Sequence, residues 1–137
     1  MGNEISINKI GFEDVQFAIQ QNYVIINTLS INKQECLIRN TINYHEEEDV
    51  INDFINNTNS SVYIIIYGEN YVDKTAIDKY IKLAQCGFTN LYLYCGGLFE
   101  WLLLQDIYGN DNFPTTGKEL DILKFRTNTY LNKKYLK

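Results

Sequence analysis

The sequence is poor in proline, histidine and cysteine, and each shortage excludes some structures or some chemistry. Pro114 is the only proline among 137 residues, so helices and strands can run without interruption. His45 is the only histidine, which leaves few groups for acid–base work or metal binding. The three cysteines contain no C-x-x-C pair, which argues against a disulfide framework or a zinc site: Cys36, Cys86 and Cys95.

Long apolar runs are also missing, so the sequence predicts neither a membrane span nor the apolar region of a signal peptide. We therefore expect a reducing, cytoplasmic location. The first six residues, Met1 to Ser6, match the N-myristoylation pattern, with Gly2 exposed once Met1 is removed. The alternative is a chance match or an added glycine. One myristoyl chain holds a membrane only weakly, and the basic C-terminal tail could supply the second signal that membrane association needs.

Charge is spread unevenly along the chain, whose net charge is -5. The segment from Lys118 onward holds six of the 12 Lys and Arg residues but only two of the 17 acids. The body is therefore acidic and a poor surface for nucleic acid. We expect the basic tail to contact that acidic body, with an acidic partner or an anionic membrane as alternatives.

Length and composition predict one globular domain, because 45% of the residues are hydrophobic and no linker-like segment interrupts the chain. We expect the domain to span residues 1–117, followed by an extension, 118–137, that packs on it or is partly disordered. Strands and helices are predicted to alternate, which is typical of an open, mainly parallel α/β sheet of about five strands with helices on both faces. The predicted strands are 4–10, 23–26, 36–38, 41–42, 62–67 and 90–94, and the predicted helices are 12–20, 46–55, 73–86 and 98–107.

Ligands bind such sheets beyond the carboxyl ends of the strands, which directs attention to the loops 68–74 and 95–98. Both loops lead into a helix N-terminus, where free N–H groups favour anions.

Several segments resemble the rhodanese family. The segments 24–29, 36–43 and 64–67 resemble three strand regions of that family, the last being the strand that carries its nucleophile. The spacing from Gly87-Phe88 through Gly96-Gly97 to Trp101 resembles the family's most specific signature. The resemblance covers about residues 12–108 and implies a rhodanese-like fold in the sulfurtransferase superfamily.

The resemblance also implies that the family's chemistry is lost. Gly68 stands where sulfurtransferases of the family carry their cysteine, and glycine has no side chain that can hold sulfur. The loop that begins at this position lacks the family's arginines and adds two carboxylates, so we expect it to repel anions. The loop consists of Gly68, Glu69, Asn70, Tyr71, Val72, Asp73 and Lys74. Asn27 and Leu29 replace an Asp and an Arg of the family pattern. These departures predict a catalytically inactive protein-interaction or regulatory module.

Cys95 is the alternative nucleophile, because it ends a strand next to the Gly68 loop and precedes a helix N-terminus. The competing interpretation is a small buried hydrophobic residue. Cys86 and Cys36 are weaker candidates for a nucleophile. We expect Cys86 to lie on the buried face of helix 73–86 and to belong to the hydrophobic core. His45 and the acids at 46–48 are interpreted as a solvated first helical turn, so no metal and no cofactor are predicted.

Two features favour binding to another protein. Tyr71 lies on an exposed turn, and Tyr92 and Tyr94 are paired on a strand, where they either form an interface or cover the sheet. Helix 98–107 is apolar nearly all round, so its far side needs a cover from segment 120–136 or from a second copy. A weaker alternative is a small-anion binder that uses the amides of the Gly68 loop.

Overall fold

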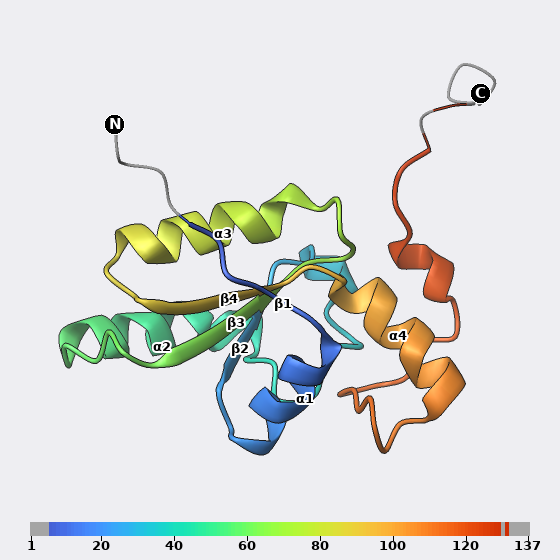
Figure 1. Cartoon of the computed structure of the whole chain (residues 1–137), viewed down its shortest axis with the longest axis horizontal. Coiled ribbons are helices and arrows are strands. Elements are labelled where there is room, and N and C mark those ends of the chain that lie inside the picture. The colour runs from blue at the N-terminus through green and yellow to red at the C-terminus, as the bar shows by residue number, and fades with distance from the viewer. Residues whose placement is uncertain (1–5, 130, 132–137) are drawn as a thin grey trace.

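The computed structural model describes residues 6–129 and 131. Strands and helices alternate along the chain, as Figure 1 shows. The strands are β1 (Lys9–Ile10), β2 (Val24–Asn27), β3 (Tyr63–Tyr67) and β4 (Asn90–Tyr94). The α-helices are α1 (Phe12–Gln20), α2 (Tyr44–Asn56), α3 (Lys74–Gln85) and α4 (Gly97–Tyr108), and two short 3-10 helices are η1 (Ile31–Lys33) and η2 (Ile122–Phe125).

The four strands form one parallel sheet in the order β1-β4-β3-β2. β3 is an inner strand that pairs with β4 along its whole length and with β2 over residues 64–67. Its central residues are isoleucines that point alternately to the two faces, and all three are buried. A continuous apolar run of this kind is expected of a strand that is covered on both faces.

The two faces of the sheet have separate cores. Ile65, Tyr67 and Tyr94 pack with residues of α1, α4 and η2, including Trp101 and Phe125. Residues of the opposite side of β2, β3 and β4 pack against α2 and α3. Figure 1 shows α1 and α3 on opposite sides of the strands. The predicted open parallel α/β sheet with helices on both faces is therefore confirmed.

Two predicted strands, 36–38 and 41–42, do not form. Only isolated bridges occur there, between Ile38 and Thr115 and between Ile25 and Thr41. The reason is local: Thr41 donates both its backbone N–H and its hydroxyl to the carbonyl oxygen of Ile38, which closes a turn. The sheet consequently has four strands.

Element ends also differ from the prediction because side chains satisfy the terminal backbone groups. Among the residues described from Ser6 onward, the first strand covers only Lys9–Ile10, since the N–H of Asn8 donates to the hydroxyl of Tyr80. α2 begins at Tyr44 because the side chain of Asn43 caps it by accepting the N–H of His45.

The prediction that Cys86 lies in the core is wrong, because its side chain is exposed. Cys86 is the residue that follows the last turn of α3, so it leaves the buried stripe of that helix. Gly87 comes next with a φ of 106°, a left-handed conformation that commonly ends helices.

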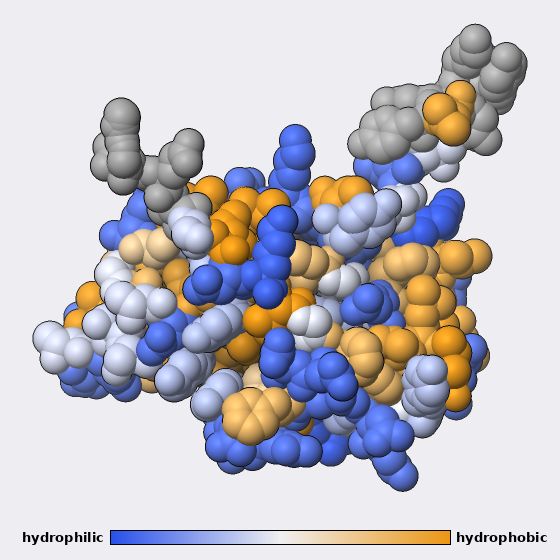
Figure 2. All heavy atoms as spheres, in the orientation of Figure 1, coloured by the Kyte–Doolittle hydropathy of each residue, from blue (hydrophilic) through white to orange (hydrophobic). Residues whose placement is uncertain are grey.

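Residues 122–125 of the C-terminal extension form η2, which packs on α4 through the fully buried Phe125. The outer side of α4 stays apolar and open, with Leu103, Ile107 and Tyr108 all exposed. Figure 2 shows apolar residues gathered on this side of the molecule. Within residues 6–129, no helix has both the length and the apolar character that crossing a bilayer requires.

Candidate functional site

The Gly68–Lys74 loop lies at the carboxyl edge of the sheet. Tyr67, the last residue of β3, is paired with Asn27 of β2 on one side and Tyr94 of β4 on the other. The two loops that the sequence indicates, 68–74 and 95–98, therefore emerge side by side, and Gly68, the first residue of one of them, is buried. This is the edge at which open α/β sheets bind ligands.

The carboxylate of Asp73 occupies the space beside Gly68. Its Oδ1 accepts the backbone N–H of Thr75 at 3.0 Å, which caps α3, and the Thr75 hydroxyl at 2.7 Å. Its Oδ2 accepts the backbone N–H of Glu69 at 2.9 Å. A Cβ atom on Gly68 would lie 2.5 Å from that Oδ2 and 3.2 Å from Oγ1 of Thr28. Any side chain at position 68 would therefore have to displace the carboxylate.

The side chain of Asn70 fixes the rest of the loop. Its Oδ1 accepts the N–H of Val72 at 3.1 Å, and its carbonyl oxygen accepts the N–H of Asp73 at 3.2 Å. Its Nδ2 donates to the carbonyl oxygen of Phe125 at 2.9 Å, which ties the loop to η2. The amides of Glu69, Val72 and Asp73 are thus already bonded within the protein, so a small anion would have to compete with these acceptors.

The N-terminus of α4 is bonded to the same loop. Leu98 and Phe99 donate their backbone N–H groups to the carbonyl oxygens of Gly68 and Glu69 at 3.0 and 2.8 Å. Gly97 makes this approach possible, since a Cβ on it would lie 2.8 Å from both the amide nitrogen of Asn70 and the Gly68 oxygen. Gly97 also has a φ of 68°, in the left-handed region that favours glycine.

A buried tyrosine and a glutamate close the β4–α4 turn. The Tyr94 hydroxyl donates to Oε1 of Glu100 at 2.5 Å. Burial of the ring, the hydrogen bond to Glu100 and the negative charge of that carboxylate raise the pKa of Tyr94 far above its ordinary value. The Glu100 carboxylate lies so close to Gly96 that a side chain there would collide with it.

Cys95 lies at the expected edge but faces the α3 side of the sheet. It is half-buried, it packs with the apolar cluster of that face, and its Sγ contacts the Leu93 carbonyl oxygen at 3.9 Å. Cys36 is buried, and burial raises the pKa of its thiol, which opposes thiolate formation. No ion pair or hydrogen bond in the described part of the chain brings an Arg, Lys or His to either sulfur.

Asn27 forms a neutral amide pair where the resemblance implies an aspartate. Its Oδ1 accepts the N–H of Leu29 at 2.9 Å and Nε2 of Gln34 at 2.8 Å, while its Nδ2 donates to Oε1 of Gln34 at 3.0 Å. Asn27 and Leu29 are both buried. This corner of the edge therefore carries no charge from either residue.

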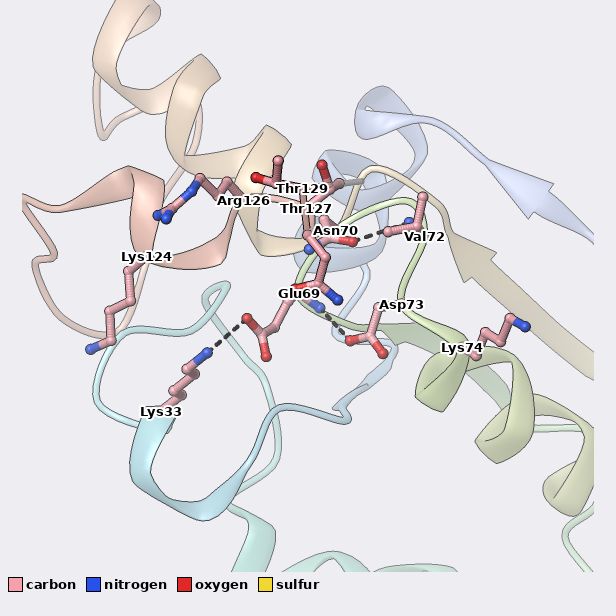
Figure 3. Close-up of a pocket in the computed structure, with 11 residues that line it drawn as sticks. Lys33, Glu69, Asn70, Val72, Asp73, Lys74, Lys124, Arg126, Thr127 and Thr129 are labelled. Carbon is pink, nitrogen blue, oxygen red and sulfur yellow. Dashed lines mark hydrogen bonds and ion pairs between the residues drawn. The ribbon is translucent and has the colours of Figure 1, made fainter. Parts of the chain in front are cut away.

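A groove of about 750 Å³ runs between the Gly68 loop and the segment that follows η2. Figure 3 shows its lining side chains, which come from η1, the loop, the start of α3 and residues 124–129. Four cations stand beside the two loop carboxylates: Lys33, Lys74, Lys124 and Arg126. In the folded protein, cations distant in sequence thus lie beside the loop carboxylates, a feature that the prediction of an anion-repelling loop did not include. Sequence reasoning missed three of these, although the opposite charges of tail and body pointed to such a contact.

The other sequence-predicted residues are scattered. Tyr71 is 73% exposed, as expected, but Tyr94 is only 1% exposed and cannot form a surface pair with Tyr92. Tyr92 instead stacks against Tyr63, with ring centroids 6.3 Å apart. Within residues 6–129, no three or more His, Cys, Asp or Glu residues are grouped to hold a metal. Gly2 lies outside the described residues.

Solved structures of rhodanese-like domains share this fold. The rhodanese-like domain of the Anabaena sp. protein Alr3790 aligns with a TM-score of 0.59 and 18% identity, over 91% of this chain and 87% of that one. The Saccharomyces cerevisiae protein Ygr203w, described as a homolog of single-domain rhodanese and of the Cdc25 phosphatase catalytic domain, aligns with a TM-score of 0.61 and 12% identity, over 85% and 91%. A second structure of Ygr203w, described as a protein tyrosine phosphatase of the rhodanese family, gives 0.59 and 13%, over 87% and 99%. No protein-family model matches the sequence, and no curated protein matches it significantly. The chain therefore has a rhodanese-like fold.

Proposed function

We propose that this chain is a catalytically inactive rhodanese-like domain that acts as a protein-interaction or regulatory module. The observation that carries the proposal is the Asp73 carboxylate, whose Oδ2 lies 2.5 Å from the place that a Cβ on Gly68 would take. Group transfer through a covalent intermediate needs a nucleophile at the end of this strand, and glycine supplies none. A carboxylate in its place also repels the anions that such a site would have to admit.

Further features at the same edge support this proposal. Asn27 and Gln34 satisfy each other as neutral amides, so they provide neither a base nor a cation. The N–H groups of Leu98 and Phe99, in the first turn of α4, bond the carbonyl oxygens of Gly68 and Glu69 and are not free for a ligand. The exposed Tyr71 and the adjacent groove provide contact surface in place of a reaction centre.

The alternative function is a sulfurtransferase that carries persulfide on Cys95. Its position favours this reading, because Cys95 directly follows Tyr94, the partner of Tyr67 across the β3–β4 pair, and so lies beside Gly68. Its half-buried setting against the α3 cluster favours a packing role instead.

The experiment that separates the two is a sulfur-transfer assay with thiosulfate or mercaptopyruvate as donor. We expect the wild-type chain to give no more transfer than a variant without its three cysteines. Transfer that disappears in Cys95→Ser but persists in Cys86→Ser would establish the alternative. Because two related structures are of Ygr203w, hydrolysis of an aryl phosphate is measured in parallel, and none is expected.

The proposal also includes the location that the sequence predicts. We expect a cytoplasmic protein, with acylation of Gly2 as a route to weak membrane contact. A Gly2→Ala variant that distributes like the wild type between membrane and cytosol would rule out that contact.

A homodimer through the open side of α4 is a further candidate, which the sedimentation coefficient at increasing concentration would test.

A further inference from the structure

The groove beside the Gly68 loop is cationic in a protein that is acidic as a whole. Its walls carry four Lys or Arg residues and two carboxylates, whereas the chain has a net charge of -5. The groove thus carries a local excess of positive charge, whereas the chain as a whole has an excess of negative charge. A local patch of opposite sign steers and orients a charged partner more than net charge does.

The two carboxylates of the groove are already satisfied. Glu69 pairs with Lys33 at 2.9 Å, and Asp73 accepts donors from Glu69 and Thr75. By contrast, neither Lys74 nor Arg126 has a carboxylate partner within residues 6–129. One guanidinium nitrogen of Arg126 donates to the Leu123 carbonyl oxygen at 2.8 Å, and its remaining donors are free to bind. The groove therefore has unpaired positive charge.

The tail wall of the groove is held in place, so these cations are not on a loose segment. Phe125 is buried, and its carbonyl oxygen accepts the side-chain amide of Asn70. The ammonium groups of Lys33 and Lys124 lie 5.8 and 5.7 Å from the centroid of the Phe125 ring. Cations held over an aromatic ring lose less freedom when a ligand binds.

The arrangement does not suit a single small anion. Figure 3 shows Lys74 on one side of Asp73 and Lys33, Lys124 and Arg126 on the other, so the cations do not converge on one point. The loop amides that would surround a small anion are bonded to Asp73 and Asn70. Separated charges along an open groove of about 750 Å³ suit an extended ligand with several separated negative charges.

We propose that the groove binds an extended acidic peptide segment of a partner protein. The acidic side chains pair with Lys74 and Arg126 and compete with Glu119, 3.2 Å away, for Lys124, while hydroxyl and amide groups of residues 127–129 bond the peptide backbone. The Asp73 carboxylate keeps its hydrogen bonds within the loop. The acidic peptide therefore lies across the loop and does not enter the space beside Gly68. This proposal rests on the interaction role above and names the chemistry of the partner.

The test measures fluorescence anisotropy of the full chain with a labelled Glu-rich hexapeptide, its Gln counterpart and its phosphoserine counterpart. We expect saturable binding of the Glu peptide, no saturable binding of the Gln peptide, and equal or tighter binding of the phosphoserine peptide. Raising the salt from about 50 to about 200 mM should weaken binding severalfold, because exposed charges are screened.

The matched variants are Lys124→Gln/Arg126→Gln in the groove and Lys9→Gln/Arg39→Gln elsewhere, each removing one Lys and one Arg from exposed positions. The groove pair should weaken binding at least about fivefold and the control pair less than about twofold. Equal losses in both variants would show attraction to net charge alone and would overturn the proposal. Lys74→Gln, on the other wall, is the second variant if the first pair alters thermal unfolding.

Two further outcomes would also overturn the proposal. The first is the absence of saturable binding to either acidic peptide. The second is stronger binding to phosphatidylserine vesicles than to either peptide, abolished by the groove variant, which would assign the groove to a membrane surface. Sulfur-transfer activity is measured separately, so a failure of the inactive-domain proposal is distinguishable from a failure of this one.

Discussion

The β4–α4 turn and the β3–α3 loop lie side by side at the carboxyl edge of the sheet, but different atoms hold them. A Cβ added at Gly97 in the first would meet backbone atoms of Gly68, Glu69 and Asn70. The nearest atoms to a Cβ added at Gly68 in the second belong to the side chains of Asp73 and Thr28. Backbone contacts within a packed sheet edge cannot relax, whereas a side chain can rotate away.

The difference separates what the fold needs from what the site contains. The glycine signature around Gly96 and Gly97 follows from close packing and does not depend on any reaction. The space beside Gly68 could hold different side chains on the same backbone, and in this chain it holds a carboxylate. A fold can therefore keep its framework while the group in its site changes.

The largest predicted effect concerns Gly97. Gly97→Ala should lower the free energy of unfolding by about 3 kcal/mol or more, because the added Cβ meets backbone atoms and the φ is left-handed. Gly11→Ala is the matched control, because nothing lies within 4 Å of its added Cβ and its φ is -102°. It should cost less than about 1 kcal/mol. Urea unfolding measures both, and equal losses would remove the proposed contrast between backbone and side-chain contacts.

The next effect is the loss of the Asp73 carboxylate. Asp73→Ala should cost about 1–2 kcal/mol, because it removes the cap of α3 and the acceptor for the Glu69 N–H. Asp73→Asn keeps an oxygen for the Thr75 cap and should lose less. Urea unfolding measures both variants, and equal losses would mean that the oxygen kept for the Thr75 cap does not contribute to stability.

A smaller effect links Gly68 to Asp73. Gly68→Ala alone should cost about 1 kcal/mol by pushing the carboxylate out of its hydrogen bonds, but it should cost almost nothing in an Asp73→Ala background. The double-mutant cycle should thus give a coupling energy of at least about 0.5 kcal/mol. Additive losses would indicate that Asp73 does not fill the Gly68 space in solution.

The smallest predicted effect is a loss of folding stability that is absent near neutral pH and appears only at alkaline pH. Tyr94 and Cys36 have pKa values raised above their ordinary values of 10.0 and 9.0, mainly by burial. The folded state therefore keeps protons that the unfolded chain releases, so stability is fully present below about pH 9 and falls as the pH rises further. Tyr94→Phe should make this alkaline decline shallower, as measured by urea unfolding between pH 8 and pH 11. An unchanged slope would argue against a raised pKa of Tyr94 in the folded protein.

The framework could be predicted from the sequence better than the site. The strand 90–94 and the buried run 62–67 could be located because their apolar patterns are local and pronounced. The errors came from side chains that replace ladder bonds, as at Thr41, and from Cys86, which follows the last turn of its helix. These are contacts of individual atoms, which periodicity does not report.

Two features of the site depend on the folded chain. Asp73 could be recognised as an acid that opposes anions, and its spacing to Thr75 is typical of a helix cap, but its position inside the Gly68 space depends on how the loop closes. The groove depends on Asn70 and Phe125, which are 55 residues apart. No local pattern links such distant residues, although the basic tail and the acidic body made a contact plausible.

The central claim is that no sulfur can be held at this site, and intact mass spectrometry tests it most directly. The reduced chain is exposed to thiosulfate and, separately, to mercaptopyruvate, and its mass is compared with that of Cys95→Ser. We predict no gain of sulfur on any cysteine. A gain of one sulfur atom that is absent in Cys95→Ser would contradict the claim and make this protein a sulfurtransferase that uses the neighbouring strand.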